Sequence, residues 1–153
     1  MRLYITGGVG SGKTTLARRL SAATGIPCCH LDELVYEPDP DNPGDDRKRP
    51  PEARDALFAE VIARPRYIIE DAGRECFAEG MRRADRVIFL DLPRRVRLFR
   101  VVRRWIRQNL GLEACIYRPD WAMLGSMLRW TMEYRGGARP NLLPFAGKLV
   151  ALR

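Results

Sequence analysis

The sequence predicts an α/β fold in which helices surround a mostly parallel sheet, and three observations support this. Short apolar, β-prone segments alternate with longer segments whose apolar residues recur at helical spacing. Three of the short segments end at acidic residues, and a glycine-rich loop joins the first of them to the first helical segment. Neither a linker nor an internal repeat divides the 153 residues, so we expect one domain over residues 1–153.

The N-terminal part begins with a strand, a loop and a helix. Residues 3–5, Leu-Tyr-Ile, stop at glycines, which indicates a short buried strand. From Lys13 the apolar residues follow helical spacing until Gly25. Residues 27–31 predict a second strand. Prolines and an acidic run then predict a loop over residues 37–51.

A helix and two strands follow. Pro51 suits the first position of a helix, and apolar residues at helical spacing continue it to about Arg64. Residues 67–69 predict a third strand, which ends at two acidic residues. Residues 86–90 predict a fourth strand, which also ends at an acidic residue.

The C-terminal part predicts two helices and a last strand. In the helix at 94–108, apolar and basic residues line different sides; the apolar side holds Phe99, Val102 and Ile106, and the basic side Arg97, Arg100, Arg104 and Arg107. Pro119 opens the next helix, which two glycines end, and residues 148–152 predict a fifth strand.

Charge is distributed unevenly along the chain. The formal net charge is +8, and residues 94–153 hold 13 basic and 3 acidic side chains, a net charge of +10. Such a surplus fits nucleic acid, anionic lipid or a phosphorylated small substrate. The sequence predicts no membrane span and no signal peptide. The four cysteines lack metal or CxxC spacing, so we expect a cytoplasmic protein.

The glycine-rich loop matches the phosphate-loop pattern GxxxxGK[ST] in full, with residues Gly7, Gly8, Val9, Gly10, Ser11, Gly12, Lys13 and Thr14. A strand before it and a helix after it are the context that the motif requires. Its glycines let backbone N–H groups approach phosphate oxygens. Lys13 is expected to reach the β- and γ-phosphates, Thr14 to bind Mg²⁺, and Thr15 to lie under the α-phosphate. The loop therefore predicts ATP and Mg²⁺ as ligands.

Acidic residues at the strand ends are candidates for chemistry, because ligands of open parallel sheets bind at the carboxyl ends of the strands. We expect Glu70 and Asp71 to bind Mg²⁺ or substrate, with helix capping as the alternative for Asp71. Asp32 is expected on the acceptor side, where it would orient a hydroxyl or take its proton, again with capping as the alternative. Asp91 fits a helix cap.

Arginines form a second set of candidates. Arg100, Arg104 and Arg107 share one helix face, and such a face can clamp a transferring phosphoryl group or can simply be solvated. Arg74, just past the third strand, is a candidate phosphate ligand. His30, the single histidine, is interpreted as a packing residue at a strand end rather than as a catalyst.

These motifs resemble the adenylate-kinase-like P-loop kinases, and within them the small bacterial DNA topology modulation (FlaR-like) proteins. Four segments carry the resemblance: residues 4–15, residues 31–36, residues 88–93, and residues 103–111 with 117–119. The resemblance implies a three-layer P-loop NTPase fold with a five-stranded parallel sheet in the order 2-3-1-4-5. It also implies an acceptor-side insertion at about 33–65 and a lid-like region at about 104–120.

The same resemblance implies roles for single residues. Glu70 falls on the Mg²⁺-associated acid and Arg74 on the arginine that grips an acceptor phosphate. Arg100 resembles an adenine-stacking and phosphate-facing residue, and Arg104 a phosphate clamp. Asp32 resembles the acid that meets the acceptor hydroxyl in shikimate-type kinases.

The leading functional hypothesis is a kinase that transfers a phosphoryl group from ATP, with Mg²⁺, to a small acceptor such as a nucleotide or nucleoside. Its catalytic residues would be Lys13, Asp32, Arg100 and Arg104. The alternative is a nucleic-acid-binding protein, for DNA topology modulation, in which the ATP site is regulatory. A nucleotide hydrolase is a third possibility.

Overall fold

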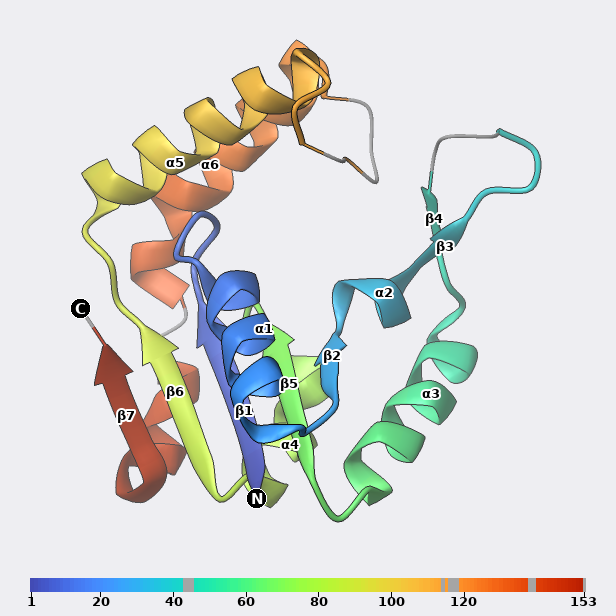
Figure 1. The fold of residues 1–153 in the computed structure, drawn as a ribbon, viewed down its shortest axis with the longest axis vertical. Helices are drawn as coiled ribbons and strands as arrows, with labels where there is room; N and C mark the ends of the chain where they lie inside the picture. Colours follow the sequence, from blue (N-terminus) through green and yellow to red (C-terminus); the bar gives the residue numbers. More distant parts are fainter. Residues whose placement is uncertain (43–45, 114, 116–118, 138–139, 153) are drawn as a thin grey trace.

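A five-stranded parallel sheet forms the centre of the computed structural model, which describes residues 1–42, 46–113, 115, 119–137 and 140–152. Its strands are β1 (Arg2–Gly7), β2 (Cys28–His30), β5 (Tyr67–Asp71), β6 (Arg86–Leu90) and β7 (Leu149–Leu152). They are arranged in the order β2-β5-β1-β6-β7, and every neighbouring pair is parallel (Figure 1). When only the five strands of this sheet are numbered along the chain, their order is 2-3-1-4-5. The predicted α/β fold and strand order are therefore confirmed.

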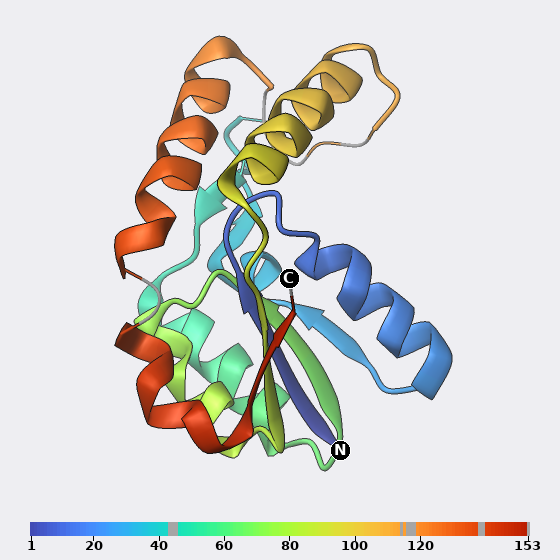
Figure 2. The ribbon, with the colours of Figure 1, turned by 90° about the vertical axis from the view of Figure 1, so that its left-hand side faces the viewer.

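Helices cover both faces of the sheet (Figures 1 and 2). Helix α1 (Lys13–Thr24) lies on one face, while α3 (Pro51–Ala63), α4 (Ala78–Arg83) and the 3₁₀ helix η2 (Pro140–Lys148) contribute to the core on the other. Because successive strand side chains point to opposite faces, Leu3 and Ile5 pack toward α1 while Tyr4 packs into the opposite core. The sheet is thereby the middle layer of three.

Two helix boundaries follow from the residues that were predicted to set them. Helix α1 ends at Gly25, which adopts φ 65° and donates its N–H to the carbonyl oxygen of Ser21. Helix α3 begins with Pro51 in its first turn, where the missing N–H removes no hydrogen bond. Both helices therefore start and stop close to their predicted positions.

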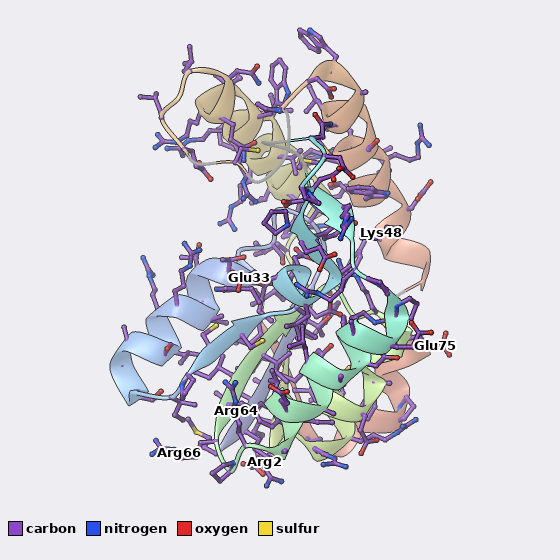
Figure 3. All side chains as sticks on the ribbon, turned by 90° about the vertical axis from the view of Figure 1, so that its right-hand side faces the viewer. Arg2, Glu33, Lys48, Arg64, Arg66 and Glu75 are labelled. Carbon is purple, nitrogen blue, oxygen red and sulfur yellow. The ribbon has the colours of Figure 1, made fainter. Side chains whose placement is uncertain are left out.

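The prediction of a loop over residues 37–51 is wrong in part. After the short helix α2 (Asp32–Val35), strands β3 (Tyr36–Pro38) and β4 (Asp46–Lys48) form an antiparallel hairpin. Glu37 on β3 forms an ion pair at 3.0 Å with Arg47, its register partner on β4, and a second at 3.1 Å with Arg49, just past β4; the cross-strand pair stabilises the hairpin. Figure 3 labels Glu33 on α2 and Lys48 on β4 in the middle of the view, above Arg2, Arg64 and Arg66, which lie toward its lower end.

Helices α5 (Arg94–Asn109) and α6 (Trp121–Gly137) pack side by side beyond the carboxyl ends of the strands (Figure 1). Val101 of α5 and Leu124 and Met127 of α6 form their shared core. The apolar side predicted for α5 instead faces solvent, and Phe99 is 66% exposed. Within the lid-like region at 104–120, residues 114 and 116–118 lie outside the described part of the chain.

Helix α6 begins at Trp121 rather than at Pro119. The carboxylate of Asp120 accepts a hydrogen bond from the N–H of Met123 at 2.7 Å, which satisfies a free donor in the first turn of the helix. The 3₁₀ helix η1 (Glu75–Phe77), α4 and η2 were not predicted from the sequence. Over the described residues, every helix is too short or too polar to cross a membrane.

Candidate active site

The phosphate loop occupies the carboxyl end of β1 and leads directly into α1. Gly10 adopts φ 74° and Gly12 adopts φ 91°, a left-handed region in which a side chain would be strained. A Cβ atom added at Gly10 would also lie 2.7 Å from the carbonyl oxygen of Arg97, on α5. The glycines therefore let the loop turn tightly and let α5 approach it closely.

Lys13 bends back over this loop. Its Nζ donates a hydrogen bond to the carbonyl oxygen of Gly8 at 3.1 Å and lies 4.0 Å from Oε1 of Glu70. Burial lowers the pKa of Lys13, although the negative charges of Glu70 and Asp32 oppose this effect. A buried cation that donates to its own loop is suited to exchange that contact for a phosphate oxygen.

Two hydroxyl side chains of the loop, those of Ser11 and Thr14, are placed to bind a ligand. Among the described side chains, none pairs with the buried Oγ of Ser11. Thr14 donates its hydroxyl to Oε2 of Glu70 at 3.1 Å, which leaves oxygen lone pairs for a cation. Thr15 is exposed at the start of α1.

Glu70 ends its strand beside the loop and accepts hydrogen bonds from two elements. Nδ1 of His30, on the neighbouring strand β2, lies 2.8 Å from Oε2 of Glu70. Burial alone would raise the pKa of Glu70, but the His30 hydrogen bond and the charge of Lys13 outweigh it and lower the pKa. Contacts with the Cys28 sulfur and with Glu70 raise the pKa of His30 to about 10. Glu70 is therefore a carboxylate at neutral pH.

Asp71 faces the opposite side of the strand and is fully buried, with a side-chain exposure of 0%. Its Oδ2 accepts the backbone N–H groups of Gly73 and Arg74, each at 2.6 Å, and the hydroxyl of Tyr4 at 3.2 Å. Its Oδ1 accepts Nη1 of Arg74 at 2.6 Å. Asp71 thus fixes the turn after β5 and the arginine that follows it.

Arg74 connects Asp71 to Asp32, the acid that the sequence predicted on the acceptor side. Nη2 of Arg74 donates to Oδ1 of Asp32, whose side chain is largely exposed. Burial would lower the pKa of Arg74, but the carboxylates of Asp71 and Asp32 outweigh this and raise it. The sequence-predicted residues Asp32, Asp71 and Arg74 are therefore brought together, with the cation between the two acids.

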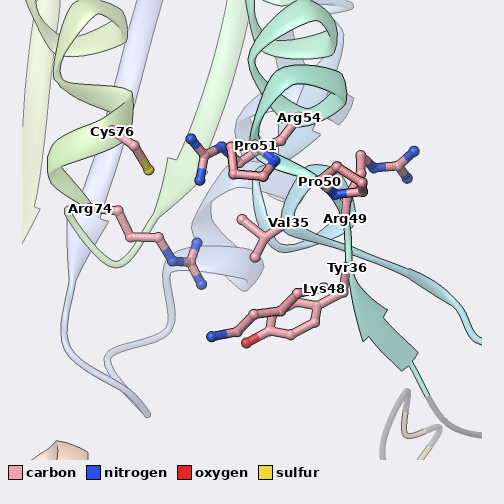
Figure 4. A pocket seen from close by; sticks show the side chains of 9 residues that line it. All are labelled: Val35, Tyr36, Lys48, Arg49, Pro50, Pro51, Arg54, Arg74 and Cys76. Carbon is pink, nitrogen blue, oxygen red and sulfur yellow. The ribbon is translucent and has the colours of Figure 1, made fainter.

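A pocket of about 480 Å³ opens next to this triplet (Figure 4). Its apolar part comes from valine, proline and cysteine, and its polar part is one tyrosine and four cations; the lining residues are Val35, Tyr36, Lys48, Arg49, Pro50, Pro51, Arg54, Arg74 and Cys76. In Figure 4 the charged ends of Arg54, Arg74 and Lys48 gather on one side, with the hydroxyl of Tyr36 beside Lys48, while Arg49 points the other way. The lining therefore favours a small anionic ligand.

The basic face of α5 divides into two parts. Nη1 of Arg100 donates to the carbonyl oxygen of Ser11 at 3.4 Å, so Arg100 lies against the phosphate loop. Arg104 and Arg107 instead form ion pairs with Glu113, at 3.3 Å and 3.4 Å. The structure thus brings Arg100 to the loop and pairs Arg104 with Glu113.

Arg97 and Tyr134 also contact the phosphate loop, which was not predicted from the sequence. Arg97 is buried, donates to the carbonyl oxygens of Leu92 and Thr131, and has its guanidinium 5.5 Å from the ring centroid of Tyr134. A Cβ atom at Gly8 would meet both side chains, at 2.4 Å and 2.8 Å. Arg97 and Val101 are four residues apart on α5 and face the loop together. This spacing was the sequence signal that could have indicated the contact.

The donor set fits Mg²⁺ held jointly with nucleotide phosphates. Mg²⁺ usually takes one or two carboxylates, substrate phosphates and water rather than an all-protein cage. Within the described chain no group of three or more histidine, cysteine, aspartate or glutamate side chains could bind a metal ion. The hydroxyl of Thr14 beside the carboxylate of Glu70 matches the sparse arrangement that such a shared site requires.

No protein-family model and no curated protein matches the sequence. Solved structures with a similar fold include a shikimate kinase from Bacteroides thetaiotaomicron, at 21% identity and a TM-score of 0.57 over 99% of this chain and 84% of the other. A shikimate kinase from Acinetobacter baumannii in complex with shikimate has 18% identity and a TM-score of 0.57, over 99% and 83% of the two chains. A gluconokinase from Sinorhizobium meliloti 1021 has 17% identity and a TM-score of 0.53, over 99% and 81%. This chain therefore has the fold of the small P-loop kinases.

Proposed function

We propose that the protein is an ATP- and Mg²⁺-dependent phosphotransferase that acts on a small, negatively charged acceptor with a free hydroxyl. One observation carries the proposal. A complete phosphate loop with an acidic partner lies beside a basic pocket, and Asp32 and Arg74 lie between the two, close enough to Lys13 to affect its pKa. Nucleotides, as well as hydroxy acids such as shikimate and gluconate, belong to this acceptor class.

On the donor side, the chain supplies a phosphate cradle. The first N–H groups of α1 have no acceptor within the helix and, with the positive end of the helix dipole, favour phosphate oxygens. Lys13 would exchange its contact with Gly8 for the β- and γ-phosphates, and Arg100 would reach them from α5. Thr14 and Glu70 would hold Mg²⁺, which supplies charge neutralisation at the phosphates.

On the acceptor side, Arg74, Arg54 and Lys48 would bind the anionic group of the acceptor. Asp32 is engaged by Arg74 in the free protein. An incoming anion would compete for that guanidinium and release Asp32 to accept a hydrogen bond from the acceptor hydroxyl. Asp71 would act through Arg74, because its hydrogen bonds, apart from the one it accepts from the Tyr4 hydroxyl, serve the turn and the arginine.

In the proposed reaction, the γ-phosphoryl group moves from ATP to the acceptor hydroxyl. The acceptor oxygen forms a bond to the γ-phosphorus, the bond from that phosphorus to the bridging oxygen breaks, and ADP leaves. The hydroxyl proton passes to Asp32 or to water. Lys13 and the arginines stabilise the charge on the transferring group, and this is the main contribution a protein makes to such a reaction.

The test is ATP turnover with Mg²⁺ across nucleoside monophosphates, nucleosides, shikimate and gluconate, with products identified by mass spectrometry. We expect one anionic acceptor to be phosphorylated and Lys13→Ala to abolish both ATP binding and turnover. If wild-type protein binds ATP in a Lys13-dependent manner but phosphorylates no acceptor, the protein is a nucleotide-binding switch rather than a kinase.

The nucleic-acid alternative gains no support. Several cations of the basic C-terminal part already have partners: Arg97 and Arg100 lie against the phosphate loop, and Arg104 and Arg107 pair with Glu113. The similar folds reported above are all small-molecule kinases. We therefore assign the surplus of arginine in part to phosphate chemistry.

A further inference from the structure

We propose that His30 is a positioning residue that holds the carboxylate of Glu70 toward the phosphate loop, and so sets how well the protein binds ATP together with Mg²⁺. This inference rests on the donor side of the proposed function alone. It requires no particular acceptor. It also assigns a role to a residue that the sequence alone indicated only as packing.

Strand pairing brings the two residues together. In the parallel pair β2–β5, His30 is the register partner of Glu70, so both side chains leave the same face at the carboxyl end of the sheet. Nδ1 of His30 and Oε2 of Glu70 are 2.8 Å apart, with side-chain exposures of 17% and 9%. A contact this short between two largely buried groups is a strong, oriented hydrogen bond.

The bond from His30 fixes which oxygen of Glu70 faces which partner. Oε2 receives both His30 and the hydroxyl of Thr14, and Oε1 is left 4.0 Å from Nζ of Lys13. The terminal torsion of a glutamate is intrinsically broad, so a carboxylate without a second donor would rotate. His30 therefore keeps one oxygen of Glu70 on Thr14 and the other toward Lys13.

The imidazole is itself held from its other side. Nε2 of His30 lies 3.9 Å from Sγ of Cys28, two residues earlier on the same face of β2. The ring is thus fixed between a sulfur and a carboxylate, and Nδ1 is directed at Glu70. This arrangement resembles the outer partners that orient metal-binding side chains and whose loss lowers metal affinity by about 10- to 100-fold.

The experiment compares ATP affinity in Mg²⁺ with ATP affinity in EDTA for wild-type protein and two His30 variants, by calorimetry. His30→Phe fills the ring volume without a donor. His30→Asn places an amide N–H₂ close to the position of Nδ1. We expect the Mg²⁺-dependent gain in affinity to fall about tenfold or more in His30→Phe and to be largely retained in His30→Asn, while affinity in EDTA stays within about twofold in both.

A double-mutant cycle of His30→Phe and Glu70→Gln tests whether His30 acts through Glu70. If His30 acts through Glu70, the double variant His30→Phe/Glu70→Gln loses no more of the Mg²⁺-dependent gain than Glu70→Gln alone. Cys29→Ala, on the other face of the same strand, is the matched control for disturbance of β2 and should leave the gain unchanged. Equal loss in His30→Asn and His30→Phe, or additive losses in the cycle, would overturn the proposal.

Failure of the proposed function gives a different result. If wild-type protein binds ATP more tightly with Mg²⁺ but phosphorylates no acceptor, the kinase function fails and the role of His30 is still decided by the variants. If Mg²⁺ gives wild-type protein no gain in ATP affinity, the inference about His30 is wrong.

Discussion

Arg74 donates from Nη1 to Oδ1 of Asp71 at 2.6 Å, and its backbone N–H donates to Oδ2 of the same carboxylate at 2.6 Å. One buried acid therefore fixes both the backbone and the side chain of the arginine that lines the basic pocket. The outer end of the guanidinium is bound by Asp32, which is largely exposed. The two contacts of Arg74 differ in burial, so their loss should have different consequences.

Asp71→Asn tests the buried contact. The amide keeps the shape but loses the charge and part of the acceptor capacity, so we expect the free energy of unfolding to fall by about 1.5–3 kcal/mol, measured by denaturant titration. The KM for the acceptor should rise because Arg74 is no longer held. Asp32→Asn removes the negative charge from the exposed contact and should change stability by about 1 kcal/mol or less while it lowers kcat. Equal stability losses in the two variants would contradict this assignment.

Gly8→Ala tests the contact of α5 and α6 with the phosphate loop. The new methyl group would lie 2.4 Å from Nη1 of Arg97 and 2.8 Å from Cδ1 of Tyr134, so these side chains must move. We expect a destabilisation of about 1–3 kcal/mol and weaker ATP binding, measured by thermal unfolding and calorimetry. Gly125→Ala is the control, because its Cβ meets open space on α6 and should stabilise by up to about 1 kcal/mol. Unchanged ATP affinity in Gly8→Ala would mean that α5 and α6 do not constrain the loop.

The sequence predicted the phosphate loop and the strands because both depend on local signals, whereas the order of the strands followed only from the resemblance to P-loop kinases. Glycines at fixed spacing, a lysine and a threonine define the loop, and apolar runs define the strands. The role of Asp71 was only partly predictable. The sequence allows helix capping by Asp71, but its bond to Arg74 requires the backbone turn at Gly73, which adopts φ 91°.

Contacts between strands and between helices were harder to predict. His30 and Glu70 are 40 residues apart, and they meet only because β2 lies next to β5. On α5 the apolar stripe suggested a buried side, yet the helix turns Phe99 outward and buries Arg97 against the loop. Helical periodicity shows that a helix has two sides, whereas the position of the phosphate loop decides which side is buried.

Arg100 and Arg104 differ in their free-state contacts, and this predicts different mutant phenotypes. Arg100 already touches the phosphate loop, so Arg100→Ala should weaken ATP binding in calorimetry. Arg104 is exposed and paired with Glu113, and an exposed ion pair can be released at a cost of about 1 kcal/mol or less.

If Arg104 clamps the transferring group, Arg104→Ala should lower kcat by about 100-fold or more and leave ATP affinity unchanged. Glu113→Gln, which frees the arginine, should not lower kcat. If Arg104→Ala leaves kcat unchanged, Arg104 does not clamp the transferring group, and its role is the ion pair with Glu113.

Cysteine labelling tests the acceptor pocket without any knowledge of the acceptor. Cys76 is exposed and lines the pocket, whereas Cys29 is packed against the core on β2. Burial, together with the nearby negative charge of Glu33, raises the pKa of Cys29 to about 11, so at pH 8 only about one Cys29 in a thousand is a thiolate.

We therefore expect iodoacetamide at pH 8 to modify Cys76 well before Cys29, as followed by peptide mass spectrometry, and to inhibit phosphoryl transfer by filling the pocket. Inorganic phosphate at high concentration should slow the labelling of Cys76, because Arg74 and Arg54 would hold the anion beside it. Cys76→Ser should keep its activity in the presence of the reagent. Inhibition of Cys76→Ser at the wild-type rate would place the sensitive thiol elsewhere and separate the pocket from the reaction.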